Sequence, residues 1–232
     1  MYAFFYIIAK IKKFVLKYAK GEKKIMNIFL VRHGDDDERY RGGWSSLPLT
    51  QLGIEKAKKL ADFLNNEQED IKIDRIISSD LKRAKMTADI INEKLNVKIK
   101  YDKRLRENNN GILAGMLNEE AIRIFPNMYF SRLEYDERFP EGESPKEFYE
   151  RIKEAFFSIL NENNDVENLM LVTHAGVINI IYHIISNIEW SNKQKKLKIP
   201  KTSITKIVIN NQDKQMCYVG ITPHLNIQKS EE

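Results

Sequence analysis

Histidine and arginine side chains follow two apolar runs of this 232-residue chain, at the points where strands would end. Residues 29–31 lead directly into Arg32 and His33, and residues 169–173 lead into His174. A short apolar run that ends at polar residues and a glycine is typical of a buried strand. In α/β folds, ligands bind just outside the carboxyl ends of such strands. These three side chains are therefore expected at a ligand-binding or catalytic site at the carboxyl ends of the strands.

Another strand end adds a cation to this set. Residues 73–77 form an apolar run, Ser79 follows it, and Arg83 lies in the first turn of the helix expected next. A phosphate near a helix N-terminus gains from free backbone N–H groups, and the planar guanidinium of arginine suits phosphate oxygens. Taken singly, each of these residues is more often a solvated charge or a hydrogen-bonded histidine. Their joint placement predicts a pocket for a dianion.

The hydrophobic pattern supplies the elements that would bring these residues together. Apolar runs predict strands over residues 29–31, 73–77, 97–101 and 169–173. Helical segments are expected after Thr50, after Ser79 as far as about Leu95, from Ser144 through Leu160, and over residues 177–185. Alternating strands and helices indicate an α/β three-layer sandwich, with a mostly parallel central sheet flanked by helices. Two alternating segments predict an antiparallel edge at residues 204–209 and 215–221.

The helix starts carry recognisable caps. Thr50 is expected to cap a helix whose apolar face comprises Leu52, Ala57, Leu60, Ala61 and Leu64. The polar residues before the next helix can cap it in the same way, namely Ser78, Ser79 and Asp80. Ser144-Pro145-Lys146-Glu147 combines a serine cap, a proline at the first position and a glutamate at the third, which is a strong helix start.

Residues 104–140 show only weak periodicity, and we expect them to form a lid over the sheet. Aromatic side chains gather in this segment at Phe125, Tyr129, Phe130 and Tyr135. Substrate specificity would depend on how this lid is arranged.

Charge is distributed unevenly along the chain, whose net charge is +5. Residues 1–25 contain seven lysines and one glutamate, whereas the chain from Met26 onward has 31 basic and 32 acidic residues. The nearly neutral body argues against nucleic-acid binding. The single cysteine, Cys217, excludes an internal disulfide framework and fits a reducing compartment, and we expect it to be a buried, inert thiol. No stretch has the roughly 18 apolar residues that span a bilayer, so a cytoplasmic location is expected.

The chain divides into residues 1–25 and a body of residues 26–232. Apolar residues between Phe4 and Tyr18 recur at helical spacing, with lysines on the opposite side, which is typical of a basic amphipathic helix on an anionic membrane surface. Contact with a membrane would depend entirely on residues 1–24. The alternative is that translation begins at Met26, directly before the first strand.

Six motifs in order resemble the histidine phosphatase superfamily, whose fold is that of phosphoglycerate mutase. The motifs span residues 27–209, and the N-terminal extension lies outside the resemblance. They are Leu30-Val31-Arg32-His33-Gly34, Pro48-Leu49-Thr50-Gln51-Leu52-Gly53, Ser79-Asp80-Leu81-Lys82-Arg83-Ala84, Leu105-Arg106-Glu107 with Gly111 and Gly115, Gly142-Glu143-Ser144, and Val172-Thr173-His174-Ala175-Gly176.

This resemblance implies a role for each residue of the pocket. His33 would be the nucleophile that takes up the phosphoryl group. Arg32, Arg83 and His174 would hold the phosphoryl oxygens. Glu107 would protonate the leaving alcohol and then deprotonate the attacking water. The substrate would be a small phosphorylated metabolite, and neither a metal nor another cofactor is expected, because the arginines supply the positive charge.

The loop after the nucleophile departs from the family pattern. Members usually carry Glu or Gln after the glycine, then Ser or Thr, and an asparagine a few positions on, whereas this chain has Asp35-Asp36-Asp37-Glu38. We expect a solvated charged loop, because carboxylates in the pocket would oppose phosphate unless they point away or pair with Arg39 and Arg41. The run lacks the spacing of a calcium loop. Arg41 is a further candidate for substrate binding.

Three kinds of function are compatible with this pattern. The first is a phosphatase that hydrolyses small phosphomonoesters through a phosphohistidine intermediate. The second is a cofactor-dependent phosphoglycerate mutase, but mutases of this family resemble one another in a longer insertion after the acid and a nearby tyrosine, where this chain has Asn108, Asn109 and Asn110. The third is a catalytically silent module that binds phosphorylated ligands. The remaining histidines, His183 and His224, are expected to be structural, and nothing indicates the oligomeric state.

Overall fold

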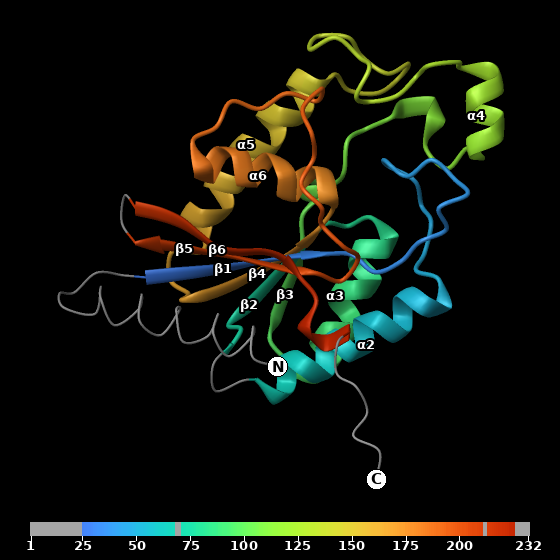
Figure 1. The fold of residues 1–232 in the computed structure, drawn as a ribbon. Helices are drawn as coiled ribbons and strands as arrows, with labels where there is room; N and C mark the ends of the chain where they lie inside the picture. Colours follow the sequence, from blue (N-terminus) through green and yellow to red (C-terminus); the bar gives the residue numbers. More distant parts are fainter. Residues whose placement is uncertain (1–24, 68–70, 211–212, 226–232) are drawn as a thin grey trace.

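The computed structural model describes residues 25–67, 71–210 and 213–225, so the predicted helix of residues 1–24 lies outside it. Strands alternate with helices along most of the chain (Figure 1). The strands are β1 (Ile25–Arg32), β2 (Arg75–Ser78), β3 (Lys98–Tyr101), β4 (Asn168–Thr173), β5 (Ile204–Asn210) and β6 (Asp213–Ile221). The helices are α2 (Gln51–Asn66), α3 (Lys82–Leu95), α4 (Asn118–Ile124), α5 (Pro145–Glu162) and α6 (Ala175–Ser186), with short 3-10 turns at Lys103–Leu105, Gly111–Leu113 and Pro223–Leu225.

One six-stranded sheet, in the order β3-β2-β4-β1-β5-β6, forms the centre of the fold. The first four strands of this order run parallel, while β5 runs antiparallel to β1, and β6 antiparallel to β5. The predicted mostly parallel sheet with an antiparallel edge is therefore confirmed. Because β5 runs opposite to β1, the start of β5 lies beside the carboxyl end of β1.

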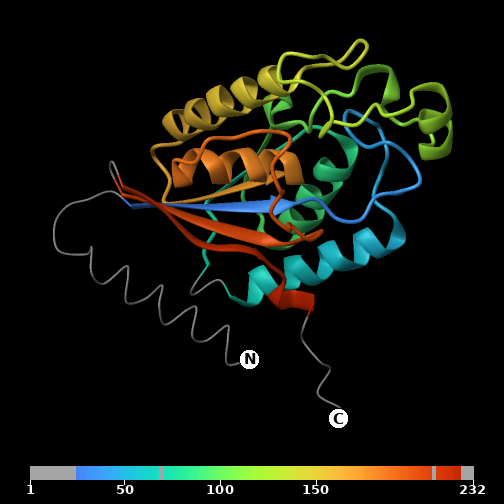
Figure 2. The ribbon, with the colours of Figure 1, turned by 45° about the horizontal axis from the view of Figure 1, so that its top comes forward.

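Side chains of the central strands alternate between two cores, one on each face of the sheet. Ile28 and Leu30 of β1 pack with α5 and α6, whereas Phe29 and Val31 pack with α2 and α3. Figures 1 and 2 show α5 and α6 above the sheet and α2 below it. The sandwich thus buries β1 on both faces, and Arg32 lies at its end.

Two expectations about helix starts are wrong in detail. Thr50 does cap α2, since its hydroxyl accepts from the amide of Gly53 at 3.2 Å, but Leu52 is 51% exposed. Gly53 lies on the buried side instead, where a Cβ would overlap with the backbone of Asp35. The loop that follows β1 therefore packs directly on the first turn of α2.

The polar residues before α3 do not cap it. Leu81 occupies the cap position and makes no side-chain capping hydrogen bond, although the Ser79 hydroxyl accepts from the amide of Leu81 at 3.4 Å. Ser79 is hydrogen-bonded to His174 at 2.9 Å, and Asp80 forms an ion pair with Arg106 at 2.6 Å. These side chains have partners far away in the sequence, which local pattern reasoning could not show.

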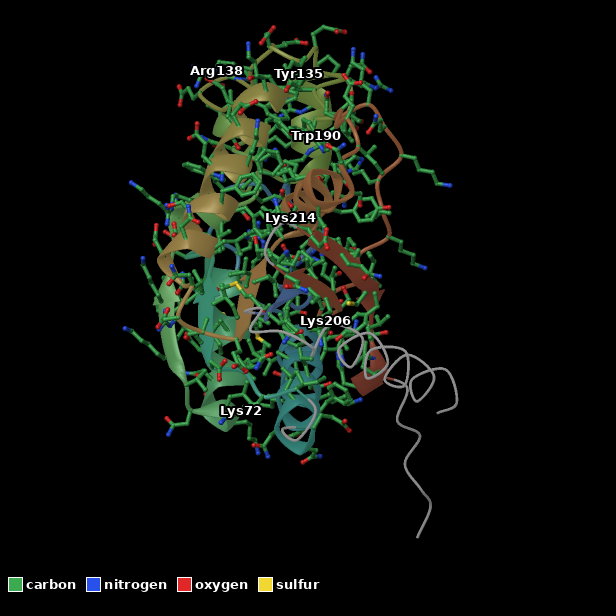
Figure 3. The ribbon with its side chains drawn as sticks, turned by 90° about the vertical axis from the view of Figure 1, so that its left-hand side faces the viewer. Lys72, Tyr135, Arg138, Trp190, Lys206 and Lys214 are labelled. Carbon is green, nitrogen blue, oxygen red and sulfur yellow. The ribbon has the colours of Figure 1, made fainter. Side chains whose placement is uncertain are left out.

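The lid segment of residues 104–140 lies beyond the end toward which β1 points (Figures 1 and 2). It has a small core of its own, formed by Leu113, Ala121, Leu133 and Phe139. Phe130 joins this core to the main body, because its ring packs edge-on against Phe148 of α5, with ring centroids 5.8 Å apart. Tyr135 and Trp190, both labelled at the same end of the molecule in Figure 3, have ring centroids 6.5 Å apart.

The start of α5 provides a test of the local reasoning. Ser144 accepts from the amide of Glu147 at 3.2 Å, and Glu147 accepts from the amide of Ser144 at 2.8 Å. Replacing Ser144 with alanine removes one half of this box, so the free energy of unfolding should fall by about 1 kcal/mol. Urea unfolding measures the change. A variant as stable as the wild type would contradict the capping role.

Candidate active site

The carboxyl ends of β1, β2 and β4 bring the predicted residues together. The amide of His33 donates to the carbonyl of Thr173 at 2.9 Å, and the amide of Ser79 donates to that of Val172 at 2.9 Å. As a result, the rings of His33 and His174 lie with their centroids 5.0 Å apart. Both histidines are buried. The juxtaposition expected from the strand ends is present.

Hydrogen bonding selects the tautomer of His33. Its Nδ1 lies 2.7 Å from the carbonyl oxygen of Gly34, which can only accept, so Nδ1 carries the proton. Burial lowers the pKa of His33 well below 6.5, and the neighbouring His174 and Arg83 lower it further. The ring is therefore neutral near pH 7, and Nε2 carries an unprotonated lone pair. Arg83 Nε donates to this Nε2 at 3.3 Å.

Arg83 is almost completely buried, which is unusual for an arginine. Its Nη1 donates to the hydroxyl of Ser45 at 3.2 Å, and its Nη2 donates to the carbonyl of Gly43 at 2.7 Å. Burial lowers its pKa below the usual value, but an arginine remains charged. The loop that contains Gly43 and Ser45 therefore fixes a permanent positive charge beside the His33 ring.

Two buried nitrogen atoms at this site have no hydrogen-bond partner among the described residues. They are Nδ1 of His174 and Nε of Arg32. The opposite nitrogen of the His174 ring is engaged with Ser79 at 2.9 Å, and Arg32 Nη1 donates to the carbonyl of Ile199 at 2.6 Å. Unpaired buried polar groups are costly. A bound group with acceptor oxygens, such as a phosphoryl group, would satisfy both.

Glu107 lies against the N-terminus of α6. Its carboxylate accepts from the amide of Gly176 at 3.1 Å and from the amide of Asn108 at 3.1 Å. A Cβ at position 176 would overlap with Glu107 Oε1, so glycine is needed for this approach. The carboxylate is thus held next to Gly176, two positions after His174, and its charge acts on Arg32 and Arg83.

The backbone around Glu107 is clamped by two side chains that sequence reasoning missed. Trp44 Nε1 donates to the carbonyl of Glu107 at 2.7 Å, and Arg151 of α5 donates to the same carbonyl at 3.1 Å. Arg151 also donates to the carbonyls of Arg104 and Arg106 and forms an ion pair with Glu143 at 2.6 Å. This clamp holds the segment that carries the carboxylate.

A cavity opens beside Glu107, with an empty volume of about 550 Å³ that is partly open to solvent. Its lining combines the aromatic rings of Phe130, Phe148 and Trp190 with polar side chains that include Asn179 and Gln194. Mixed apolar and polar walls are typical of sites for small molecules. Of the candidate site residues, Glu107 alone lines this cavity in the described part of the chain.

Comparison with known proteins is consistent with this geometry. The family model of the histidine phosphatase superfamily (branch 1) matches residues 28–222. This chain belongs to the histidine phosphatase superfamily. Phosphoglycerate mutase-like protein 4 of Arabidopsis thaliana is 34% identical over 206 residues, which cover 85% of this chain and 86% of that protein. The predicted family and fold class are confirmed.

Two further similarities place this histidine phosphatase among its relatives. A broad-specificity phosphatase of Saccharomyces cerevisiae is 28% identical over 221 residues, covering 88% of this chain and 89% of that one. The crystal structure of the α-ribazole phosphatase from Shigella flexneri superposes with a TM-score of 0.73 at 22% identity, covering 85% of this chain and 97% of that one. The relatives are named as phosphatases and mutases, as expected for an enzyme. Within the described residues, the helices are too short or too polar to cross a membrane.

The acidic loop of this histidine phosphatase differs from the expected solvated loop. Asp37 is paired with Arg39 at 2.6 Å, as anticipated, but Asp35 is paired with Lys56 at 3.0 Å. Asp36 points into the site, since its Oδ2 lies 3.6 Å from Arg83 Nε. The expectation is therefore wrong for Asp36, whose side chain is 10% exposed.

Asp36 has a second partner that sequence reasoning missed, Lys201, which forms an ion pair with it. Lys201 precedes β5, whose antiparallel pairing with β1 places its start at the carboxyl end of β1. The sequence predicts an antiparallel edge at this strand but not its pairing with β1, so it indicates no role for this lysine.

Arg41 is not joined to the other candidate residues. Its guanidinium lies 4.6 Å from the ring centroid of Tyr129 in the lid, and no hydrogen bond or ion pair with the five other candidates is present in the described part of the chain. Its role in substrate binding stays a prediction.

His183 and His224 make hydrogen bonds with Asn179 and Thr202, respectively, as structural histidines do. Cys217 is only partly buried, and burial raises the pKa of its thiol.

The lowered pKa of the buried histidines predicts a loss of stability in acid. Unfolded histidine has a pKa of about 6.5, whereas burial holds the pKa of both His33 and His174 well below 6.5. The unfolded chain therefore binds more protons as the pH falls below about 6.5, and the free energy of unfolding decreases. In His174→Gln, this decrease between about pH 7.5 and 5 should be smaller by about 1–2 kcal/mol.

Urea unfolding at the two pH values measures this difference. Because each protein is compared with itself, a general loss of stability in the variant cancels. An equal pH dependence in both proteins would show that His174 takes up a proton in the folded state as readily as in the unfolded chain.

Proposed function

We propose that this chain is a phosphatase that hydrolyses small phosphomonoesters through a phosphohistidine intermediate. The observation that carries the proposal is the placement of the buried His33 ring, whose Nδ1 faces the Gly34 carbonyl and whose Nε2 accepts a hydrogen bond from the buried guanidinium of Arg83. A nucleophile needs an unprotonated lone pair, and the phosphoryl group needs positive charge next to it. Both requirements are met at one atom.

In the first half of the reaction, His33 Nε2 attacks phosphorus and forms an N–P bond while the ester P–O bond breaks. Arg32, Arg83 and His174 bind the phosphoryl oxygens, on which charge is concentrated in a loose transition state. The leaving oxygen takes a proton from Glu107 in its protonated form. The product alcohol then leaves through the cavity beside Glu107.

In the second half, Glu107 acts as a base. Its carboxylate takes a proton from water, the water oxygen attacks phosphorus, and the N–P bond breaks. Inorganic phosphate and neutral His33 are released, and Glu107 is protonated again for the next cycle. The clamp formed by Trp44 and Arg151 on the carbonyl of Glu107 keeps the carboxylate in place for both proton transfers.

The relatives support a small phosphorylated metabolite as the substrate. One is named a broad-specificity phosphatase, and one structure is that of a phosphatase for α-ribazole. The cavity beside Glu107 has aromatic and polar walls but limited room, which favours a small alcohol over a macromolecule.

Phosphate release from a panel of phosphorylated metabolites tests this proposal against mutase activity. Other relatives carry the name of phosphoglycerate mutase, which makes this the principal alternative. A hydrolase releases inorganic phosphate from at least one monoester in the panel. A protein that releases none, but isomerises phosphoglycerate when primed with a bisphosphate, would refute the phosphatase.

Replacing His33 with alanine should reduce kcat/KM by about 10⁴-fold or more, because the attacking atom is lost. Labelled substrate and rapid quenching should trap a phosphorylated wild-type protein and no labelled variant. Circular dichroism controls for folding. Substantial turnover or labelling by the variant would mean that another residue is the nucleophile.

Glu107→Gln should distinguish substrates by their leaving groups. An alkyl phosphate needs a proton on its leaving oxygen, so its rate should fall by about 10²–10⁴-fold. A nitrophenyl phosphate leaves as a stable anion and should lose far less in the same preparation. Steady-state kinetics with both substrates measure the contrast, and equal losses would argue against Glu107 as the acid.

A further inference from the structure

We infer that Lys201 is an additional phosphoryl-binding residue of this site and that the Asp36 carboxylate competes with the phosphoryl group for it. The inference rests on the proposed function in one respect, namely that the dianion binds beside His33. It extends that function by adding Lys201 to the cations of the phosphoryl site and Asp36 as their counter-ion within the protein.

Backbone hydrogen bonds fix the Lys201 segment against the nucleophile. The amide of Thr202, the next residue, donates to the carbonyl of Arg32 at 3.0 Å and approaches that of His33 at 3.3 Å. On the other side of Lys201, the carbonyl of Ile199 accepts from Arg32 Nη1 at 2.6 Å. The position of Lys201 is therefore tied to the same strand end that carries the pocket.

The ammonium group of Lys201 lies inside the site rather than in solvent. Its side chain is only 11% exposed, and its charge helps to lower the pKa of both His33 and His174. Burial lowers the pKa of Lys201 itself, and the nearby positive charge of Arg32 acts in the same direction. A buried ammonium beside another cation is unfavourable unless an anion balances it.

Asp36 is the carboxylate that provides most of this balance. It is paired with Lys201, its Oδ2 lies 3.6 Å from Arg83 Nε, and its Oδ1 lies 4.0 Å from His33 Nδ1. Glu38 is more distant, at 3.8 Å from Lys201, and its side chain is 80% exposed. Asp36 thus occupies the surroundings of two cations, Lys201 and Arg83.

A phosphoryl dianion beside His33 would come close to the same two cations. It would attract Lys201 and repel Asp36, so the two anions compete for one ammonium group. The pocket therefore binds phosphate less tightly than its cations alone would allow. Weaker binding of inorganic phosphate favours the release of this product.

Binding of inorganic phosphate, measured by calorimetry, tests the inference without requiring turnover. Lys201→Met removes the cation and should weaken phosphate binding by about tenfold. Asp36→Asn removes the competitor and should tighten binding by about threefold or more. The double variant should lie between the two single variants, because both charges are lost together.

Neighbouring residues in the same two segments provide matched controls. Lys198→Met removes an exposed lysine three positions away, and Asp37→Asn removes a carboxylate that faces Arg39. Both should bind phosphate as the wild type does. Circular dichroism checks that each variant is folded, and Lys201→Gln is a second replacement in case the methionine variant is not.

Each result decides the matter. If loss of the Lys201 ammonium leaves phosphate binding unchanged, or if Asp36→Asn binds phosphate no more tightly, the inference is overturned while the hydrolysis of monoesters by the wild type still supports the proposed function. If the wild type binds phosphate but hydrolyses no ester, only the proposed function fails. If neither the wild type nor Asp36→Asn binds phosphate, the inference is overturned, whereas phosphate release from an ester by the wild type would still support the proposed function.

Discussion

The hydrogen bond from His33 Nδ1 to the carbonyl of Gly34 determines what the rest of the site can do. It places the ring proton on the nitrogen that faces the backbone, so the other nitrogen faces Arg83 with its lone pair. Burial keeps the ring neutral, because a charged imidazole would lose its hydration. Without this bond, the second tautomer would present an N–H group to the guanidinium, and neither the hydrogen bond from Arg83 nor an attack on phosphorus could take place.

The two halves of the site are held by different parts of the fold. The histidine pair depends on the sheet, because the register of β1, β2 and β4 brings His33, Ser79 and His174 to the same edge. Glu107 depends on contacts from outside the sheet, with Trp44 and Arg151 on its backbone and Gly176 on its carboxylate. A change in the residues around Glu107 and its cavity would therefore leave the placement of His33 and His174 by the sheet unaffected.

Local sequence patterns predicted those features whose causes are local. The strand ends, the Thr50 cap and the Ser144 capping box all follow from residues within one or two turns. The errors concern side chains whose partners are distant in the sequence. Ser79 is engaged with a residue 95 positions away, and Asp36 with one 165 positions away. The prediction that Leu52 is buried is wrong for a different reason, since Gly53 takes the buried position where the Asp35 backbone approaches α2.

The balance of charges explains how a carboxylate can lie in a phosphate pocket. Arg32, Arg83 and Lys201 face Asp36 and Glu107, so the cations exceed the carboxylates by one before a ligand binds. Without Asp36 the excess would be two cations, which would bind substrate and product phosphate alike, and uniform binding of this kind does not accelerate the chemical step. In the proposed mechanism, Asp36 lowers the affinity for any free dianion, whereas attack by His33 and proton transfer by Glu107 take place only in the transition state. The acidic loop is therefore compatible with turnover because it weakens ground-state binding.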